Sequence, residues 1–262
     1  MPEVDFRSPR LFVDAALASG ASIPLDRNQG NYLGNVMRLA AGNTVLVFNG
    51  RDGEWQAVIA GRKRPDRLDI LAQARTQDRL PDLNYVFAPL KHARLDYMVQ
   101  KAVEMGASTL QPVLTRFTQV NRVNIDRMRA NVIEAAEQCG ILSLASVEEP
   151  VALDRWLSQR HGNQDNPDVS RLLIFCDEAA ETTDPVAALA AARQASSAGI
   201  DVLIGPEGGF AEEERAALLR QPRIVRLALG PRILRADTAA VAALTLVQAA
   251  LGDWTGPPRA GI

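Results

Sequence analysis

The sequence is poor in the residues that build metal sites and disulfides. Its 262 residues include two cysteines, Cys139 and Cys176, and two histidines, His92 and His161, all far apart. None of the four stands at the spacing of a metal-ligand motif. We therefore expect no metal site and no structural disulfide, which is typical of a protein from a reduced compartment.

Long hydrophobic runs are also missing. No apolar stretch approaches the roughly 20 residues that a helix needs to span a bilayer. The first residues include Glu3, Asp5 and Arg7 and do not resemble a secretory signal peptide. We expect a cytoplasmic protein with no membrane partner.

Charge of one sign is not in excess. The formal net charge is −2, which does not by itself indicate a nucleic-acid-binding protein. The densest basic run consists of Arg62, Lys63, Arg64 and Arg67. Two interpretations are open for this run: a solvated loop between strands, or a surface that binds phosphates. Arginine outnumbers lysine 26 to 3, which suits phosphate recognition but also fits a general composition bias.

Short strands and turns dominate the first 76 residues. Runs that predict strands lie at 11–13, 44–48, 55–59 and 68–71. The turn-forming cluster at 49–53 is typical of a hairpin, and one short helix is expected around 30–37. This pattern predicts a small β-barrel domain over residues 1–76, and the polar stretch at 77–82 is expected to be a linker.

From residue 83 the pattern alternates between strands and helices. Apolar runs that predict strands occupy 85–88, 110–114, 172–176, 202–204 and 224–229. Helical patterns occupy 95–105, 126–139, 187–192, 211–219 and 238–251. This alternation is typical of an α/β domain with a mostly parallel sheet. We place this domain at 83–252, followed by a tail at 253–262 that we expect to fray.

Two glycine–proline loops near the C-terminal end each follow a predicted strand. The first reads Ile204-Gly205-Pro206-Glu207-Gly208-Gly209. The second reads Leu229-Gly230-Pro231-Arg232-Ile233-Leu234-Arg235 and leads into Ala236-Asp237-Thr238-Ala239. Ligands usually bind at loops that follow the carboxyl ends of strands in an open α/β sheet. We therefore expect the two loops to line one small-molecule pocket.

The first loop is suited to a ligand that approaches the main chain. Gly205, Gly208 and Gly209 can adopt positive φ angles and have no Cβ, whereas the carboxylate of Glu207 is a poor partner for phosphates. The dinucleotide and phosphate-loop fingerprints are absent from this loop. A cationic or ribose-bearing ligand is favoured over a pyrophosphate. The alternative is that both loops are tight strand-to-helix turns.

The two loops resemble those of the RsmE family of 16S ribosomal RNA uridine N3-methyltransferases, which belongs to the SPOUT superfamily. Four further segments follow the family's order, namely Arg10–Val13, Val36–Leu39, Gln100–Gly106 and Glu134–Gly140. The resemblance covers nearly the whole chain. It implies a SPOUT-type α/β domain with a trefoil knot, an N-terminal PUA-like β-barrel that binds RNA, and a homodimer. General topology rules alone would predict an unknotted sheet.

The resemblance also implies an activity. This activity is the S-adenosylmethionine (SAM)-dependent methylation of N3 of a uridine in 16S ribosomal RNA, on the assembled 30S subunit. One alternative is a non-catalytic PUA-type RNA-binding protein, and another is a SPOUT methyltransferase that modifies a different ribosomal or transfer RNA base. A nicotinamide-dependent oxidoreductase is disfavoured, because no early strand is followed by a phosphate-binding glycine turn.

The resemblance assigns roles to particular residues. Those expected at the cofactor are Cys176, Leu203, Ile204, Gly205, Pro206, Glu207, Gly208, Gly209, Leu229, Gly230, Ile233, Leu234, Thr238 and Ala239. Asp177 and Glu178 are expected to close this pocket or, alternatively, to be a solvated strand end. Those expected at the RNA are Arg10, Arg38, Arg62, Lys63, Arg64 and Arg67.

Three residues of the second loop and the helix after it are the catalytic candidates. Methylation of uridine N3 requires loss of its proton, and arginine donors aimed at O2 and O4 would favour the anionic base. Arg235 and Arg232 can supply such donors, and Asp237 can orient Arg235, contact the cofactor or accept the proton. The alternative for Arg232 and Asp237 is a surface ion pair or a helix cap. The family usually has Glu in place of Asp237, and many members have Arg in place of Ile141.

Overall fold

The computed structural model describes residues 8–62, 64–91, 93–120, 122–160, 171–181, 184–193 and 199–255. Their contacts divide the chain into two compact units. The first contains the described residues up to Arg79 together with Ile133–Leu144, and the second contains Leu80–Val132 and the described residues from Ala145 onward.

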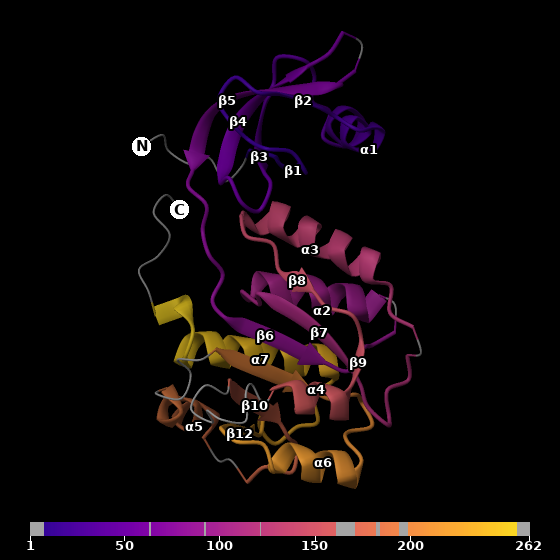
Figure 1. The fold of residues 1–262 in the computed structure, drawn as a ribbon, viewed down its shortest axis with the longest axis vertical. Helices are drawn as coiled ribbons and strands as arrows, with labels where there is room; N and C mark the ends of the chain where they lie inside the picture. The colour runs from indigo at the N-terminus through magenta and orange to yellow at the C-terminus, as the bar shows by residue number, and fades with distance from the viewer. Residues whose placement is uncertain are drawn as a thin grey trace. The chain divides into compact units, whose positions relative to one another are not determined.

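The first unit is built on one five-stranded sheet (Figure 1). Its strands are β1 (Arg10–Phe12), β2 (Ser22–Pro24), β3 (Thr44–Phe48), β4 (Glu54–Ala60) and β5 (Arg67–Arg75). They follow the order β1-β3-β4-β5-β2, with a parallel β1–β3 pair and antiparallel pairs elsewhere. Among the described residues no ladder joins β1 to β2, so hydrogen bonding between these edge strands does not close the predicted barrel. Strand β2 was not predicted, because only Ile23 of its three residues is buried and the segment has no apolar run.

A short helix precedes the β3–β4 hairpin. Helix α1 (Arg27–Asn31) continues directly into the π-helical turn η1 (Tyr32–Val36), so the predicted helix at 30–37 is present but begins earlier. It begins there because Asp26 and Gln29 form a capping box, in which the Asp26 carboxylate accepts from the Gln29 amide at 2.8 Å.

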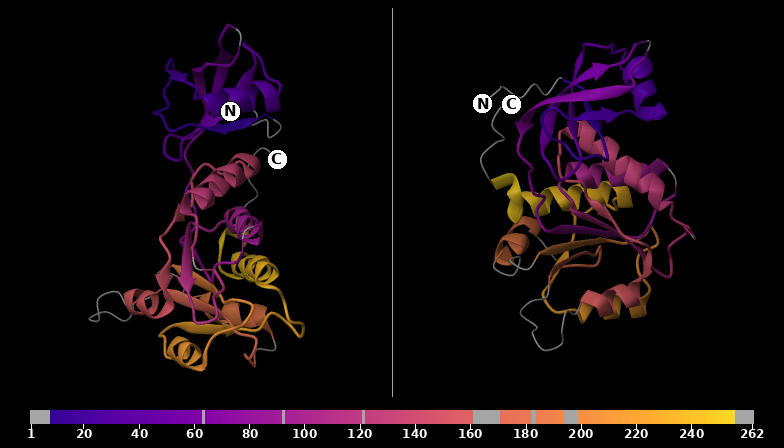
Figure 2. Two further views of the ribbon diagram at one scale, coloured as in Figure 1. Left: turned by 90° about the vertical axis from the view of Figure 1, so that its right-hand side faces the viewer. Right: turned by 45° about the horizontal axis from the view of Figure 1, so that its top comes forward.

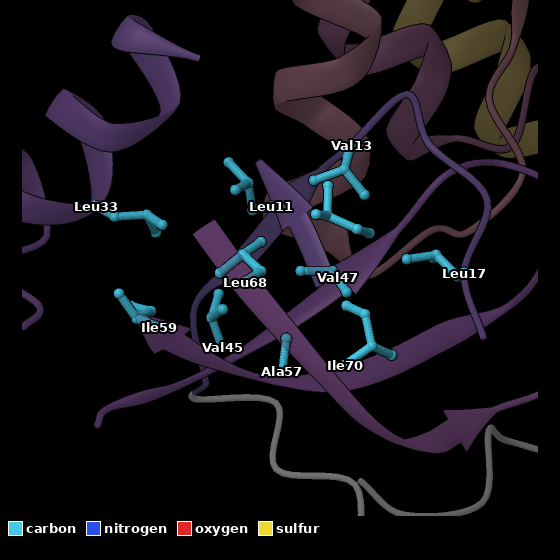
Figure 3. Close-up of a cluster of buried hydrophobic side chains, with 11 residues drawn as sticks. Leu11, Val13, Leu17, Leu33, Val45, Val47, Ala57, Ile59, Leu68 and Ile70 are labelled. Atoms are coloured by element: carbon cyan, nitrogen blue, oxygen red, sulfur yellow. The ribbon is translucent and has the colours of Figure 1, made fainter. Parts of the chain in front are cut away.

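The core of the first unit lies on one face of this sheet. Alternate residues of a strand point to the same face, and Figure 3 shows such side chains of β3, β4 and β5 grouped together, with Leu33 of η1 at one end of the group. The buried side chains are Leu11, Val13, Leu17, Ile23, Leu33, Val45, Val47, Ala57, Ile59, Leu68 and Ile70.

The second unit contains a seven-stranded sheet. Its strands are β6 (Leu83–Phe87), β7 (Thr109–Leu114), β8 (Ser146–Val147), β9 (Val151–Ala152), β10 (Leu172–Cys176), β11 (Ile200–Ile204) and β12 (Ile224–Leu227). The order is β12-β10-β11-β6-β7-β8, with β9 also paired to β7, and every pairing is parallel. The predicted α/β fold with a parallel sheet is confirmed, and the carboxyl ends of all these strands meet at one edge.

Helices cover both faces of the parallel sheet. They are α2 (Ala93–Glu104), α4 (Leu153–Arg160), α5 (Pro185–Ala191), α6 (Glu212–Leu219) and α7 (Ala236–Ala250), which is followed by the short 3-10 helix η4 (Asp253–Thr255). Helix α3 (Ile125–Cys139) is divided between the two units, with its residues from Ile133 onward in the first. Helices α2 and α7 pack together on one face, and α4 and α6 cover the other (Figure 2). No helix in the described ranges is long and apolar enough to cross a membrane.

The amino edge of the sheet is fixed by a buried charged cluster. The Asp201 carboxylate of β11 accepts hydrogen bonds from Arg160 Nε at 2.8 Å, Arg171 Nε at 2.6 Å and Asn84 Nδ2 at 2.9 Å. Asp201 is only 1% exposed, and a buried carboxylate is tolerated when it is paired in this way. The cluster ties β6, β11 and α4 at the edge opposite the glycine loops.

Candidate active site

A pocket of about 460 Å³ lies where β10, β11 and β12 end. Its walls come from the three segments that follow these strands and from the first turns of α6 and α7. The lining residues are Phe175–Ala179, Ile204–Phe210, Arg215, Leu227, Leu229–Leu234, Ala236 and Ala239. The parallel register therefore brings both glycine loops to one cavity, at the edge of the sheet where α/β proteins usually bind ligands.

All but two of the residues expected at the cofactor line this pocket. The exceptions are Leu203 and Thr238. Leu203 is fully buried in the core under α4 and α6, because its side chain points to the opposite face of the sheet from that of Ile204. Thr238 lies exposed on the first turn of α7.

Each glycine of the loops has its own reason to be glycine. Gly209 and Gly230 have φ angles of 70° and 97°, and a Cβ on either would point into open space. A Cβ on Gly205 would lie 2.5 Å from Cε2 of Phe210, so this glycine is needed for close packing. A Cβ on Gly208 would lie 3.3 Å from Cβ of Phe117. Of the three glycines expected to be able to take positive φ in the first loop, only Gly209 does so.

A charged cluster that the sequence did not reveal forms one wall. Asp177, at the end of β10, pairs with Arg215 of α6 at 2.8 Å and with Arg226 of β12 at 2.9 Å. Burial alone would raise the pKa of Asp177, but hydrogen bonds from Arg215, the Ala179 amide and Arg226 outweigh it and lower the pKa. Asp177 therefore stays ionised and neutralises part of the arginine charge beside the pocket.

Two other titratable groups near the loops are held neutral. Burial raises the pKa of the Cys176 thiol to about 12, so its sulfur is an apolar contact and not a nucleophile. The Tyr85 hydroxyl is fully buried and has no hydrogen-bond partner among the described residues. Burial, with smaller effects of Cys176 and Asp237, raises its pKa well above the ordinary value.

Comparison with known proteins identifies the domain that carries this pocket. The family model of the RNA methyltransferase domain matches residues 77–248 of the sequence. The chain belongs to the RNA methyltransferase family. A second model, for the PUA domain of RNA methyltransferases, matches residues 25–67 within the first unit.

A related ribosomal RNA methyltransferase agrees with this assignment. The chain is 27% identical over 241 residues to ribosomal RNA small subunit methyltransferase E of Rickettsia conorii. The alignment covers 91% of this chain and 94% of that protein. The resemblance to the RsmE family is thereby confirmed.

Solved methyltransferases share the fold. A Legionella pneumophila methyltransferase in complex with SAM has 26% identity and a TM-score of 0.78, covering 93% of this chain and 98% of that one. Ribosomal RNA small subunit methyltransferase E of Neisseria gonorrhoeae, bound to S-adenosyl methionine, has 25% identity and a TM-score of 0.75. The match covers 95% of this chain and 100% of that chain. The fold is similar to that of SPOUT methyltransferases and includes a small N-terminal PUA-like domain.

The catalytic candidates of this methyltransferase lie at the second loop. Arg232 lines the pocket, whereas Arg235 and Asp237 do not. Arg235 is the N-cap residue of α7, and neither arginine makes an ion pair with a described residue. Asp237, in the first turn of α7, accepts a hydrogen bond from the Thr238 amide at 2.8 Å, but it is not the N-cap residue of this helix.

The arginines expected at the RNA separate into three groups. Arg38, Arg62 and Arg64 are exposed, and Arg67 is exposed but paired with Asp69 at 3.3 Å. Lys63 lies outside the described residues. The assignment of Arg10 to RNA binding is corrected by the structure. Arg10 is 6% exposed and pairs with the buried Glu54 at 2.9 Å, so RNA cannot reach it.

Arg62 and Arg64 also line a groove of about 750 Å³ in the PUA-like unit. Residues of α1 and η1 form its other side, including Arg27 and Asn35.

In the described part of the chain, no three His, Cys, Asp or Glu side chains are grouped as a metal site requires.

Proposed function

We propose that this protein transfers the methyl group of SAM to N3 of a uridine in the 16S ribosomal RNA of the assembled small ribosomal subunit. The observation that carries the proposal is the meeting of both glycine loops around one pocket of an RNA methyltransferase domain. The SAM complexes of the two solved relatives support the choice of cofactor. A cytoplasmic location follows from this substrate.

The residues around the pocket suit SAM. Because Gly209 and Gly230 leave open space where a side chain would stand, a ligand edge can approach their main-chain groups. Ile204, Leu229 and Leu234 offer apolar contacts to the faces of an adenine ring. The carboxylate of Glu207 suits the ribose hydroxyls or the positive charges of SAM better than it would suit a phosphate.

The residues at the start of α7 suit the substrate base. SAM supplies a strongly electrophilic methyl group, so the protein mainly has to align it with N3 and favour the anionic base. The unpaired guanidinium groups of Arg232 and Arg235 can donate hydrogen bonds to uracil oxygens. The N-terminus of α7 adds partial positive charge at the same place, and Asp237 keeps that first turn in position through Thr238.

We assign RNA binding outside the pocket to the exposed arginines of the first unit. Phosphate contacts release counterions, so affinity should fall steeply with salt. Replacing both Arg62 and Arg64 by Ser should weaken binding to small subunits and flatten the salt dependence. Arg51, which is exposed in the same unit, is the matched control. An unchanged salt dependence in the double variant would assign RNA binding elsewhere.

The resemblance also supports finer features of the fold. We infer a trefoil knot formed by the segments that carry both loops, a domain boundary within 77–82, and a homodimer in which α7 meets its partner. Ile233, 94% exposed in the second loop, is a side chain that a ligand or a second subunit would cover. A chain trace from a crystal structure tests the knot, and sedimentation equilibrium tests the dimer.

Deletion of the gene tests the function in the cell. Sequencing or mass spectrometry of 16S ribosomal RNA from the deletion strain should show the loss of one N3-methyluridine. Expression of the wild-type chain should restore it, and expression of Arg235→Lys should restore it poorly. Loss of a modification on another RNA would favour the alternative SPOUT substrate, and no loss at all would favour the non-catalytic RNA-binding protein.

A further inference from the structure

An exposed aromatic ring lies beside the first glycine loop. Phe117 follows β7, whose carboxyl end is at the same edge of the sheet as the pocket. Its side chain belongs to the exposed large hydrophobic residues, with 44% of the residue accessible. Phe117 is therefore not one of the buried core residues.

The turn that carries Phe117 is held by several hydrogen bonds. The Thr115 amide donates to Thr118 Oγ1 at 2.9 Å, and the Thr118 amide donates to the Thr115 carbonyl at 3.1 Å. The Arg116 amide donates to Glu214 Oε1 of α6 at 2.8 Å. The backbone that carries the Phe117 side chain is therefore held in place by hydrogen bonds.

The ring is placed against a residue of the pocket. The Cβ position of Gly208, which lines the pocket, is 3.3 Å from Phe117 Cβ and 3.7 Å from Cγ. A side chain at position 208 would press on Phe117. Glycine at this position thus lets the aromatic side chain approach the rim of the cofactor loop.

Two ion pairs involve sequence neighbours of Phe117 and Gly208. Arg94 faces Glu207 at 3.4 Å, and Arg116 faces Glu213 at 3.9 Å. Because each of these arginines is paired with a carboxylate, the rim attracts a phosphate less than free arginines would, and it does not oppose a neutral planar group. This rim therefore suits a nucleobase better than the sugar-phosphate backbone.

We propose that Phe117 is a stacking platform for a nucleobase of the RNA substrate at the mouth of the cofactor pocket. The inference rests on the proposed function, because it supposes an RNA base that enters this pocket. Enzymes that modify a base inside a structured nucleic acid take it out of its stack. A protein aromatic ring then replaces part of the lost stacking.

Steady-state kinetics on undermethylated 30S subunits provides the first test. Phe117→Ala should lower kcat/KM for the subunit at least about tenfold, equivalent to about 1.4 kcal/mol. Phe117→Trp should stay within about threefold of wild type, because it retains an aromatic face. Calorimetry should give the same SAM affinity for all three proteins. Trp254→Ala, which removes an exposed aromatic residue beyond the far end of α7, is the matched control and should leave kcat/KM unchanged.

Fluorescence provides a second test that does not depend on turnover. With saturating S-adenosylhomocysteine, oligouridylate should quench the added emission of Phe117→Trp, after subtraction of the wild-type signal. Absence of that quenching, or a wild-type kcat/KM for Phe117→Ala, overturns the inference. A change in the sedimentation of Phe117→Ala would also overturn it, in favour of a protein contact. If instead the wild-type protein fails to methylate the subunits, it is the proposed function that fails.

Discussion

The two open glycines of the pocket allow a controlled test of the cofactor site. Gly230 has a φ angle of 97° and lines the pocket, and nothing lies within 4 Å of the place where its Cβ would stand. Gly230→Ala should therefore add a methyl group to the lumen without touching any protein atom. If SAM approaches this main-chain segment, the methyl group takes space that the ligand needs.

Gly42 of the PUA-like unit is the matched control. It has a φ angle of 92°, also has nothing within 4 Å of its Cβ position, and lines neither pocket. A non-glycine residue in the left-handed region costs roughly 1–2 kcal/mol. The free energy of unfolding should thus fall by a similar amount in Gly42→Ala and Gly230→Ala.

Only one of the two variants should affect the cofactor. Isothermal titration calorimetry should show SAM binding at least about tenfold weaker in Gly230→Ala, or about 1.4 kcal/mol, and unchanged in Gly42→Ala. Urea unfolding checks that both variants are folded and similarly destabilised. Wild-type SAM affinity in both variants, or an equal loss of affinity in both, would refute the placement of SAM at Gly230.

Three further predictions concern charged groups. Arg235→Lys keeps the charge but loses the planar fork of the guanidinium, so SAM affinity should persist while the single-turnover methylation rate falls at least about tenfold. Asp237→Glu should methylate at a rate close to that of the wild type, and Asp237→Ala should methylate more slowly. Wild-type rates in all three variants would exclude these roles for Arg235 and Asp237. The lowered pKa of Asp177 means that its ion pairs stabilise the fold above the unfolded pKa of about 3.9 and lose this effect as the pH falls below it. The difference in unfolding free energy between wild type and Asp177→Asn should shrink from pH 5 to pH 3, and a constant difference would contradict the assignment. Asp201→Ala leaves the buried Arg160 without its carboxylate and should cost about 3–5 kcal/mol, whereas a loss below 1 kcal/mol in urea unfolding would show that the cluster is not needed.

Strong local patterns made most of the fold predictable. The strands at 44–48 and 172–176 have the predicted bounds, because each is a short apolar run between turn signals. Helix α7 begins two residues before the predicted start, at Ala236, because Arg235 and not a residue of the usual capping types occupies the N-cap. Helix α4 was not predicted, although Leu153, Trp156 and Leu157 repeat at the helical spacing and are all buried.

Features that depend on distant partners were not predictable. Arg10 was assigned to RNA, but its partner Glu54 is 44 residues away on a neighbouring part of the sheet. The ion pairs of Asp177 join three separate elements, so the sequence predicted a carboxylate at the pocket but not its two arginines. Similarly, the place of Phe117 beside Gly208 follows from the parallel register of the strands and not from any local motif.

One reaction tests the central claim most directly. The purified protein is incubated with SAM labelled in its methyl group and with 30S subunits from a strain that lacks this modification, and the nucleosides of the 16S RNA are then identified by mass spectrometry. We predict one labelled N3-methyluridine per subunit with the wild-type protein, and strongly reduced labelling with Gly230→Ala at limiting SAM. Label in another nucleoside, or no label while the protein binds both SAM and the subunit, would contradict it.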